Sequence, residues 1–264
     1  MTARSNNPSP VVPIPAATLL LLRDGETGLE LLMTVRHGAI AFGSGAMVFP
    51  GGKVDAADRE LIGCCAKEGS LEEAVLIPRI AAIRETFEEC GILLARTPGS
   101  AELLREAAMA ALRGRHGSGA SFAALVKEAG LELASDLLVP FAHWITPVTG
   151  PKRYDTLFFM AEAPADQVAS HDGREAVEVA WLTPKRAMED ADGGRRKLMF
   201  ATYVNLLKLA SYPSAADALA AARRRRIVTV VPELVDAPEG PEFRIPAEAD
   251  YGITHLPARK VRRP

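Results

Sequence analysis

Residues 79–91, with the sequence RIAAIRETFEECG, place three glutamates within five positions. The stretch lacks Gly and Pro up to its last residue, so its composition predicts a helix that stops at a glycine. At about 100° per residue, Glu85, Glu88 and Glu89 fall on one side and the bulky apolar residues on the other. Arg84 lies four residues before Glu88, where it can form an ion pair along the helix. We therefore expect a helix that buries an apolar face and presents three mutually repelling carboxylates.

Three neighbouring carboxylates have two interpretations. The ordinary one is an acidic helix face exposed to solvent. The other is a site for hard divalent cations, because Mg²⁺ takes oxygen ligands and is typically held by a few carboxylates together with substrate phosphates. The residues around the helix have to distinguish between these interpretations.

The segment FPGGKVDAAD, at residues 49–58, provides this context. Its glycines, Gly51 and Gly52, allow main chain to approach a ligand closely, and an acidic loop follows. Together with RETFEECG, the segment resembles the signature of the Nudix hydrolase family. That signature is a glycine, five residues, a glutamate, seven residues and then Arg-Glu-U-x-Glu-Glu-x-Gly-U, where U is bulky and apolar. Gly52 matches the first glycine, Asp58 stands at the first glutamate, and 25 residues (59–83) replace the usual seven.

The second half of the signature matches closely. From Arg84 to Ile92, the only departure is Thr86 at a position for a bulky apolar residue. The interrupted signature resembles the subgroup that includes the mammalian peroxisomal acyl-CoA diphosphatase. The similarity covers roughly residues 14–210, with matching blocks at 121–147, 153–164 and 179–189.

A CoA-type motif upstream of the signature is only partly met. Gly45 has the expected spacing to Phe49. Arg36 lies one place nearer to Phe49 than the first arginine of the motif, and the second arginine would fall at Ala41. These departures bear on the substrate and leave the hydrolase chemistry of the resemblance intact.

The resemblance implies a metal-dependent diphosphate hydrolase with Mg²⁺ or Mn²⁺ as the cofactor. The expected reaction cleaves CoA or acyl-CoA to 3′,5′-ADP and (acyl-)4′-phosphopantetheine. Another nucleoside diphosphate derivative, such as ADP-ribose or NADH, is an alternative substrate. A Nudix-fold protein that binds a ligand without turnover is a second alternative, although such proteins often lose the glutamates that are kept here.

The same resemblance assigns roles to individual residues. Arg84 is expected to hold the glutamates in place by ion pairing. The predicted site comprises catalytic Glu85, Glu88, Glu89, Arg84 and Glu175, substrate-binding Arg36, Gly51, Gly52 and Arg153, and as metal ligands Glu85, Glu88, Glu89 and the Gly51 carbonyl.

Several of these assignments have ordinary structural alternatives. Glu175 is either a further metal ligand or general base, or an exposed glutamate at a strand edge. Arg36 and Arg153 either bind phosphates or are common strand-end arginines. His143 and His171 are alternative bases, which we rank below core and loop-surface roles.

The order of the elements predicts an α/β (α+β) fold, and the resemblance makes it a Nudix-type α/β/α sandwich with a mixed central sheet and a helical insertion. We expect a hairpin from residues 15–24 and 29–37 and the carboxylate helix at about 78–90. Further strands are predicted at 137–148, 154–163, 175–184 and 226–235, and helices within 100–134, 184–191 and 195–210. The predicted organisation is a flexible arm (1–13), a Nudix domain (14–235, with the helical insertion at about 100–134) and a C-terminal tail (236–264), whose order is left open.

The chain has 264 residues, a formal net charge of −2 and an apolar fraction of 48%. The nearly neutral charge gives no broad electrostatic basis for binding nucleic acid. We interpret the run RRRR at 223–226 as the solvated end of an Ala-rich helix. The longest apolar run, near residues 16–22, falls far short of the ~20 residues of a membrane span. Neither nucleic acid nor a membrane is therefore an expected partner.

Three cysteines, Cys64, Cys65 and Cys90, form neither a disulfide framework nor a CxxC pair. With no signal-peptide pattern at the N-terminus, a reducing cytoplasmic location is predicted. The expected partner is a small molecule that carries a nucleoside diphosphate. A homodimer is a further option that the sequence leaves open.

Overall fold

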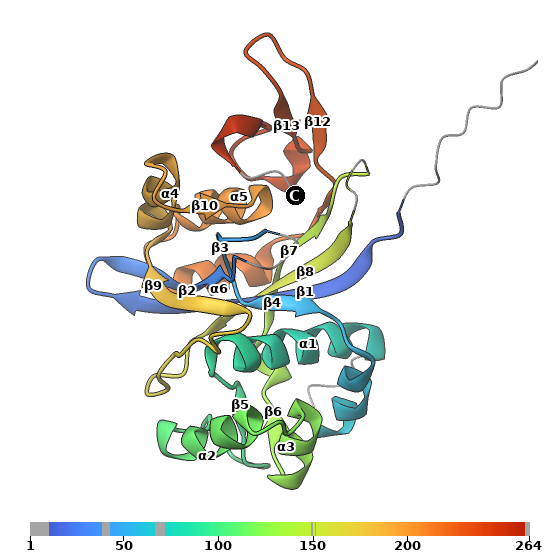
Figure 1. The fold of residues 1–264 in the computed structure, drawn as a ribbon, viewed down its shortest axis with the longest axis vertical. Helices are drawn as coiled ribbons and strands as arrows, with labels where there is room; N and C mark the ends of the chain where they lie inside the picture. The colour runs from blue at the N-terminus through green and yellow to red at the C-terminus, as the bar shows by residue number, and fades with distance from the viewer. Residues whose placement is uncertain (1–10, 39–42, 67–71, 149, 151, 262–264) are drawn as a thin grey trace, which may run out of the picture.

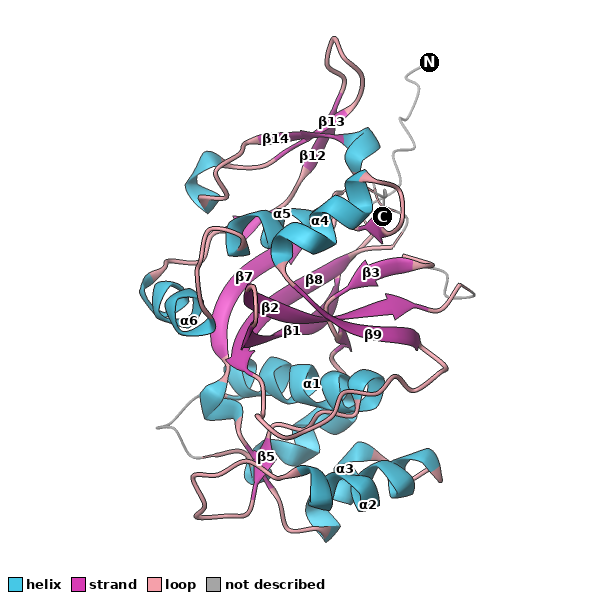
Figure 2. Cartoon of the chain, turned by 90° about the vertical axis from the view of Figure 1, so that its left-hand side faces the viewer, coloured by secondary structure: helices cyan, strands magenta, loops and turns pink. Residues whose placement is uncertain are grey.

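The computed structural model describes residues 11–38, 43–66, 72–148, 150 and 152–261. Within them a nine-stranded mixed sheet lies between two helical layers (Figures 1 and 2). The strands of this sheet are β1 (Ile14–Gly25), β2 (Gly28–Arg36), β3 (Ala46–Val48), β4 (Gly51–Lys53), β7 (Val139–Ile145), β8 (Tyr154–Glu162), β9 (Ala176–Leu182), β10 (Lys197–Leu198) and β11 (Thr229–Val230). The predicted α/β/α sandwich with a mixed sheet is confirmed.

The order of the strands is β10-β3-β2-β1-β8-β7-β11, with β4 paired to β1 and β9 paired to β2. β1 and β2 form the predicted hairpin, which closes at the pair Gly25 and Gly28. β1 also pairs in parallel with β8 along nine residues. As a central strand, β1 is apolar on both faces: Leu20 and Leu22 belong to one core cluster, and Leu19 and Leu21 to the other.

One face of the sheet is covered by α1 (Glu73–Cys90), with α2 (Glu106–Gly117) and α3 (Phe122–Glu128) beyond it. Nearby lie the 3-10 helices η1 (Ala56–Cys64) and η2 (Ser135–Leu137) and a small sheet of β5 (Ala95–Arg96) and β6 (Glu132–Leu133). The other face is covered by α4 (Pro184–Asp192), α5 (Phe200–Leu209) and α6 (Ala215–Arg224). The apolar stripes of these helices bury the two core clusters against the sheet.

The tail beyond residue 235 is built into the molecule as far as Val261. Its strands β13 (Glu242–Arg244) and β14 (His255–Pro257) pair with β12 (Glu233–Val235) in a three-stranded antiparallel sheet, which we call the C-terminal sheet. Two 3-10 helices, η3 (Ala247–Ala249) and η4 (Ala258–Lys260), belong to the same segment. Phe243, Tyr251 and Leu256 are buried in the core cluster that also contains α5. The segment is therefore packed on the domain, close to α5 in Figure 1.

Several predicted element boundaries were wrong. α1 begins at Glu73 and continues through Pro78, where the prediction had placed the helix start, because a proline so near the N-terminus removes only one interior hydrogen bond. The first helix of the insertion begins at Glu106. The helix predicted at 195–210 begins at Phe200, since the residues before it form β10. The strand predicted at 226–235 is two strands in different sheets, separated by Pro232, which cannot donate to a ladder.

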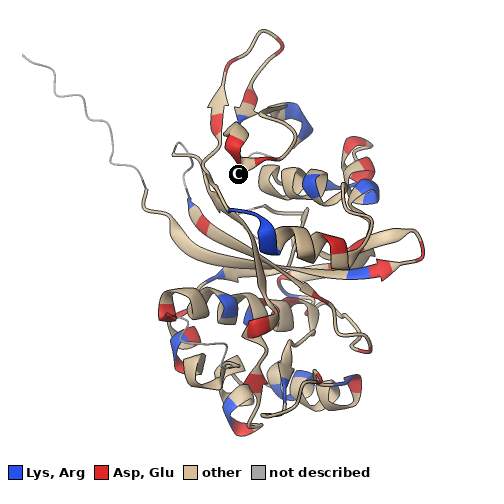
Figure 3. Ribbon diagram, turned by 180° about the vertical axis from the view of Figure 1, so that it is seen from behind, with Lys and Arg blue, Asp and Glu red and all other residues tan. Residues whose placement is uncertain are grey.

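Charged residues of both signs are interspersed over the ribbon (Figure 3), and a basic run begins in the last turn of α6. Arg223 and Arg224 are exposed in the last turn of that helix, as the solvated-end interpretation requires, whereas Arg225 turns inward over the Tyr251 ring. Among the described residues, no helix is long and apolar enough to cross a membrane. Most of the predicted flexible arm (residues 1–10) and Ala41 lie outside the described residues.

Candidate active site

A cavity of about 720 Å³ opens on the α5 face of the sheet and continues past β4 to α1. Its volume lies within the usual range for small-molecule sites. The residues of β1 explain where it forms. Ala16 and Thr18 line the cavity, whereas the next two positions on this face, Leu20 and Leu22, fill the core. The change from small to large side chains along one strand leaves one end of the sheet face open.

α1 delivers its three glutamates to this cavity. The helix ends at Gly91, which adopts the left-handed conformation (φ 67°) that glycine tolerates. The side chains of Glu85 and Glu88 are 13% and 30% exposed, and Glu89 is 4% exposed. All three line the cavity, so the interpretation as an ordinary solvated acidic face does not hold.

The paired glycines of β4 allow the carboxylates to approach the sheet. A Cβ atom on Gly52 would lie 2.5 Å from the carboxylate carbon of Glu85, and one on Gly51 would lie 2.6 Å from the Ala17 carbonyl oxygen. The Gly51 N–H donates to Glu89 Oε2 at 3.3 Å. Because these two residues of β4 have no Cβ atom, the carboxylates of Glu85 and Glu89 can pack directly against its backbone.

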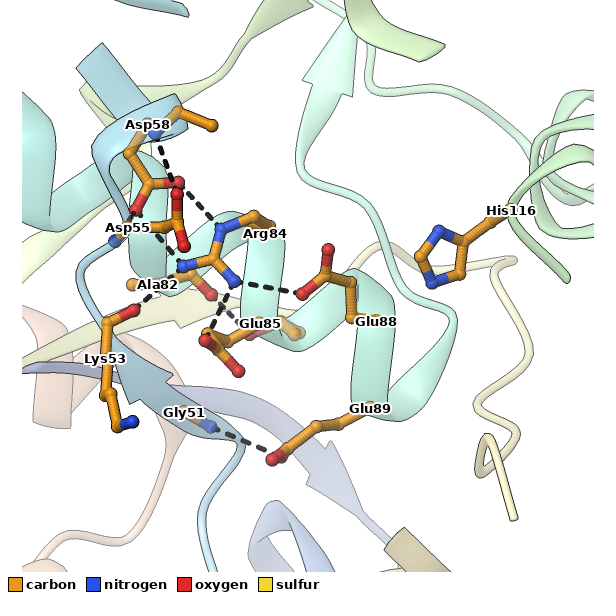
Figure 4. Close-up of polar contacts among 12 residues, drawn as sticks. Gly51, Lys53, Asp55, Asp58, Ala82, Arg84, Glu85, Glu88, Glu89 and His116 are labelled. Atoms are coloured by element: carbon orange, nitrogen blue, oxygen red, sulfur yellow. Dashed lines mark hydrogen bonds and ion pairs between the residues drawn. The ribbon is translucent and has the colours of Figure 1, made fainter. Parts of the chain in front are cut away.

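Arg84 is the centre of the polar network in Figure 4. Its Nη1 donates to Glu85 Oε1 at 2.8 Å and to Glu88 Oε2 at 2.9 Å. Its Nε and Nη2 donate to the two carboxylate oxygens of Asp58 at 2.7 and 3.1 Å, and Nη2 also reaches the Lys53 carbonyl. With every guanidinium nitrogen bonded, the arginine fixes two glutamates relative to β4 and η1.

Asp58 joins the two halves of the interrupted signature. Its side chain is fully buried, and besides Arg84 it accepts the Asp55 N–H at 2.7 Å. The Asp55 side chain accepts from the Ala57 N–H and from the Asp58 backbone, and the second of these bonds completes a reciprocal capping box at the start of η1. The sequence identified Asp58 as a signature position, but its contact with a residue 26 positions away had no local signal.

Negative charge exceeds positive charge at this end of the cavity. Burial, reinforced by Glu85, raises the pKa of Glu89 to about 8. Burial also raises the pKa of Glu85, against the opposing effect of Arg84. Within the described part of the chain, no three His, Cys, Asp or Glu side chains already form a metal site. The donors nevertheless fit a hard divalent cation, because several carboxylates converge on one cavity where removal from water penalises their charge.

Glu175 lies in the same cavity, on the loop before β9. The Asp172 carboxylate accepts the Glu175 and Ala176 N–H groups at 2.8–3.1 Å, which holds this loop in a tight turn. The Glu175 carbonyl accepts the His37 N–H, and Ser170 N–H donates to Cys90 O at the end of α1. These bonds bring the predicted glutamate toward the helix although 86 positions separate it from Glu89.

The predicted cationic residues separate into two groups. Arg36 lines the cavity, and its charge opposes the upward shift of the Glu89 pKa. Its Nε is buried and has no hydrogen-bond partner among the described residues. Arg153 is not brought to the cavity: its guanidinium is buried and donates to the carbonyls of Thr146 and Val11.

The alternative bases also lie away from the cavity. His143 is held between Thr229 and Asp155, and neither it nor His171 is among the lining residues. His116, from α2 of the insertion, does line the cavity, and its ring faces α1 in Figure 4. Since a carbonyl oxygen can only accept, its Nδ1 donates to Ala120 O and leaves Nε2 free to accept. A lone histidine in an Ala-rich helix carried no motif that could have identified it.

Comparisons with known proteins agree with this geometry. A model described as the NUDT19 Nudix domain matches residues 65–199, just over half of the chain. Acyl-coenzyme A diphosphatase NUDT19 of Xenopus laevis is 27% identical over 210 residues, covering 61% of this chain and 54% of that protein. Putative nudix hydrolase 7 of Caenorhabditis elegans is 29% identical over 173 residues, covering 66% and 53%. This chain thus spans about half the length of these curated relatives.

A solved structure extends the comparison to the fold. The NUDIX hydrolase from Alicyclobacillus acidocaldarius aligns with a TM-score of 0.68 and 26% identity, over 80% of this chain and 96% of that chain. Nudix hydrolases generally use divalent metal ions, in keeping with the carboxylates gathered here. From the family match and from the rejoined signature around Arg84, we conclude that the chain belongs to the Nudix hydrolase family.

Proposed function

We propose that this protein is a metal-dependent diphosphatase that cleaves CoA or acyl-CoA to 3′,5′-ADP and (acyl-)4′-phosphopantetheine. The observation that carries the proposal is the cavity itself: Glu85, Glu88, Glu89 and Glu175 line one end of it. Arg36 lines it too, with a buried Nε that has no hydrogen-bond partner among the described residues. The names of the NUDT19 relatives support CoA derivatives as the substrate class.

Hydrolysis of a diphosphate is largely a problem of charge. A bound Mg²⁺ or Mn²⁺ supplies positive charge that neutralises the phosphate oxygens and lowers the pKa of a water molecule. Glu85, Glu88 and Glu89 would hold it, with the Gly51 carbonyl as a further ligand. Arg36 would donate to a phosphate oxygen through its Nε, which has no hydrogen-bond partner in the described part of the chain.

Glu175 is our assignment for the general base. Arg84 binds Glu85 and Glu88, and the Gly51 N–H binds Glu89, whereas the Glu175 carboxylate has no hydrogen-bond partner among the described residues. It can therefore accept the proton of the attacking water as the new P–O bond forms and the bridging P–O bond breaks. The other phosphate leaves with the bridging oxygen.

The test is identification of products by mass spectrometry after incubation with Mg²⁺ or Mn²⁺ and CoA, an acyl-CoA, ADP-ribose or NADH. We expect 3′,5′-ADP from the CoA compounds. If AMP forms from ADP-ribose or NADH while the CoA compounds stay intact, the proposed substrate is wrong and diphosphate hydrolysis is retained. An absence of product from all four would contradict the diphosphatase and favour a ligand-binding role.

The assignment of the metal ligands has its own test. The double variant Glu88→Gln, Glu89→Gln removes two negative charges with little change in shape. We expect turnover to fall by at least ~10²-fold, because the charge that holds the cation is lost. The variant Glu128→Gln, at an exposed position on α3, is the control. Unchanged turnover in the double variant would remove these glutamates from the site.

A further inference from the structure

The cavity extends beyond the glutamates to the C-terminal sheet. At this far end its wall comes from four separate parts of the chain: Trp144 on β7, Phe200 on α5, Pro232 just before β12, and Phe243 on β13. In Figure 2 the C-terminal sheet lies above α5, on the side of the large sheet opposite to α1. The C-terminal sheet therefore supplies part of the cavity wall, although it begins more than twenty residues after the segment (14–210) that resembles the acyl-CoA diphosphatase subgroup.

The rings of this wall pack on one another. Phe200 and Phe243 are stacked with centroids 4.6 Å apart, and Trp144 meets Phe200 edge-on at 5.7 Å. The neighbouring polar lining groups are hydroxyls and one ammonium, from Thr146, Lys152, Tyr154, Thr156 and Thr202. The described lining at this end has no amide or carboxylate side chain. Amide and carboxylate side chains are common partners for the edge of a nucleobase. The apolar rings of this wall instead suit an alkyl chain.

Buried hydrogen bonds hold the C-terminal sheet in place. Trp144 Nε1 donates to the Tyr251 hydroxyl at 3.0 Å, and that hydroxyl donates to Asn205 Oδ1 at 3.0 Å. The Arg225 guanidinium lies 5.0 Å from the Tyr251 ring centroid, and Lys208 pairs with Asp250. These contacts link the segment to β7, α5 and α6, so the wall is fixed before any ligand arrives.

We propose that the C-terminal sheet forms the binding wall for the acyl arm of the substrate, with Phe243 as a specificity-determining residue that favours acyl-CoA over free CoA. The proposal rests on the CoA-type hydrolysis proposed above. A ligand whose diphosphate lies at the glutamates extends one arm along the cavity, and Phe243 contacts that arm and not the reacting phosphates.

The experiment compares kcat/KM for free CoA, hexanoyl-CoA and dodecanoyl-CoA in the wild-type protein and in Phe243→Ala. We expect the variant to lose at least ~10-fold in kcat/KM for dodecanoyl-CoA, since even one methylene contact in an apolar pocket is worth about that much, while kcat/KM for free CoA stays within about twofold. Phe243→Leu, which keeps an apolar side chain, should retain most of the preference.

The matched control is Leu234→Ala. Leu234 is directly opposite Phe243 in the pairing of β12 and β13, is 41% exposed and does not line the cavity. The Leu234→Ala variant should keep the wild-type ratio of kcat/KM for dodecanoyl-CoA to kcat/KM for free CoA. An equal loss for CoA and acyl-CoA in Phe243→Ala, or no loss at all, would overturn the proposal. Phe243→Leu gives the same comparison if the alanine variant does not fold.

Direct binding separates this proposal from the proposed function. Titration calorimetry in Ca²⁺ gives the Kd of CoA and of each acyl-CoA for the wild-type protein and for Phe243→Ala. One outcome is that the wild-type protein produces no 3′,5′-ADP but binds dodecanoyl-CoA more tightly than CoA, and that Phe243→Ala loses this difference in affinity. The proposed hydrolysis would then be wrong, and the acyl-binding role of the C-terminal sheet would be supported. If neither binding nor turnover by the wild-type protein depends on acyl chain length, the proposed acyl-binding role of the C-terminal sheet is wrong.

Discussion

At the scale of single residues, the site depends on a buried acidic side chain that touches no substrate. Asp58 binds Arg84 through two hydrogen bonds, and Arg84 in turn binds two of the glutamates. The aspartate is one carbon shorter than the glutamate usual at this position of the signature. The shorter side chain still reaches the guanidinium, with Arg84 Nε 2.7 Å from Asp58 Oδ1.

Removal of this anchor should affect both stability and catalysis. We expect Asp58→Ala to destabilise the protein by about 3 kcal/mol, because it leaves a mostly buried arginine without its principal partner. Turnover should fall as Glu85 and Glu88 lose their fixed positions. Urea denaturation and kcat measure the two effects. Asp58→Glu restores the usual side chain and should recover much of both; a fully active Asp58→Ala variant would contradict the anchoring role.

The raised pKa of Glu89 gives a prediction about pH. An unfolded glutamate ionises near pH 4.3, whereas burial and Glu85 hold the pKa of Glu89 near 8 in the folded chain. The contribution of Glu89 to the free energy of unfolding is therefore highest below pH 4.3, declines as the pH rises towards 8 and is constant above that. The metal-free protein should lose thermal stability over this interval.

Melting temperatures recorded in EDTA between pH 5 and 9 test this prediction. Glu89→Gln cannot ionise, so its stability should decline less with pH and should exceed that of the wild-type protein at pH 9. The exposed control Glu26→Gln should follow the wild-type curve. Parallel curves for Glu89→Gln and wild type would show that the carboxyl ionises at its ordinary pKa.

At the scale of elements, a helix and a short strand must meet without side chains between them. The carboxylates of α1 lie against β4 because Gly51 and Gly52 contribute no Cβ. The helix, the hairpin and the glycine turn could all be predicted, because each follows from a local pattern of residues. Three other features could not be predicted, because they depend on contacts between distant segments. These are the Asp58–Arg84 contact, the position of Glu175 in the cavity and the burial of Arg153.

A single methyl group at the glycine turn should therefore disrupt the site. In Gly52→Ala the new Cβ would collide with the Glu85 carboxylate, and a displacement of about 1 Å costs about 10²-fold in rate. Gly63→Ala is the matched control, since its Cβ would meet no atom within 4 Å. Steady-state kinetics at saturating Mg²⁺ compares the two. Equal activity in both variants would show that Glu85 does not need this approach.

At the scale of the whole molecule, groups from both faces of one sheet line the cavity. The α1 face contributes acidic groups and the α5 face contributes aromatic ones. The C-terminal sheet packs into the core cluster on the α5 face. No local pattern predicted β13 and β14, because they are three residues long and are buried by contacts with distant segments.

The Tyr251 hydroxyl links this segment to the rest of the domain. Tyr251→Phe leaves the Trp144 N–H and the Asn205 carbonyl oxygen without their partner, which should cost about 1–3 kcal/mol. Chemical denaturation measures the loss. Tyr212→Phe, a half-buried tyrosine of the same cluster with no hydroxyl hydrogen bond in the described structure, should cost less than half as much. Equal effects would show that the Trp144–Tyr251–Asn205 bonds contribute no particular stability.

The ion pair that rejoins the interrupted signature also bears on how such proteins diverge. Asp58 and Arg84 are held together by η1 and α1, whatever the length of the chain between them. Doubling the length of a flexible connection costs only about 0.6 kcal/mol in closure entropy. The interval between the two halves is consequently free to lengthen and to acquire sequence of its own, while the reacting geometry stays the same. A sequence search with a fixed spacing would miss relatives with other intervals. Their structures would identify them by an acidic side chain bonded to the signature arginine.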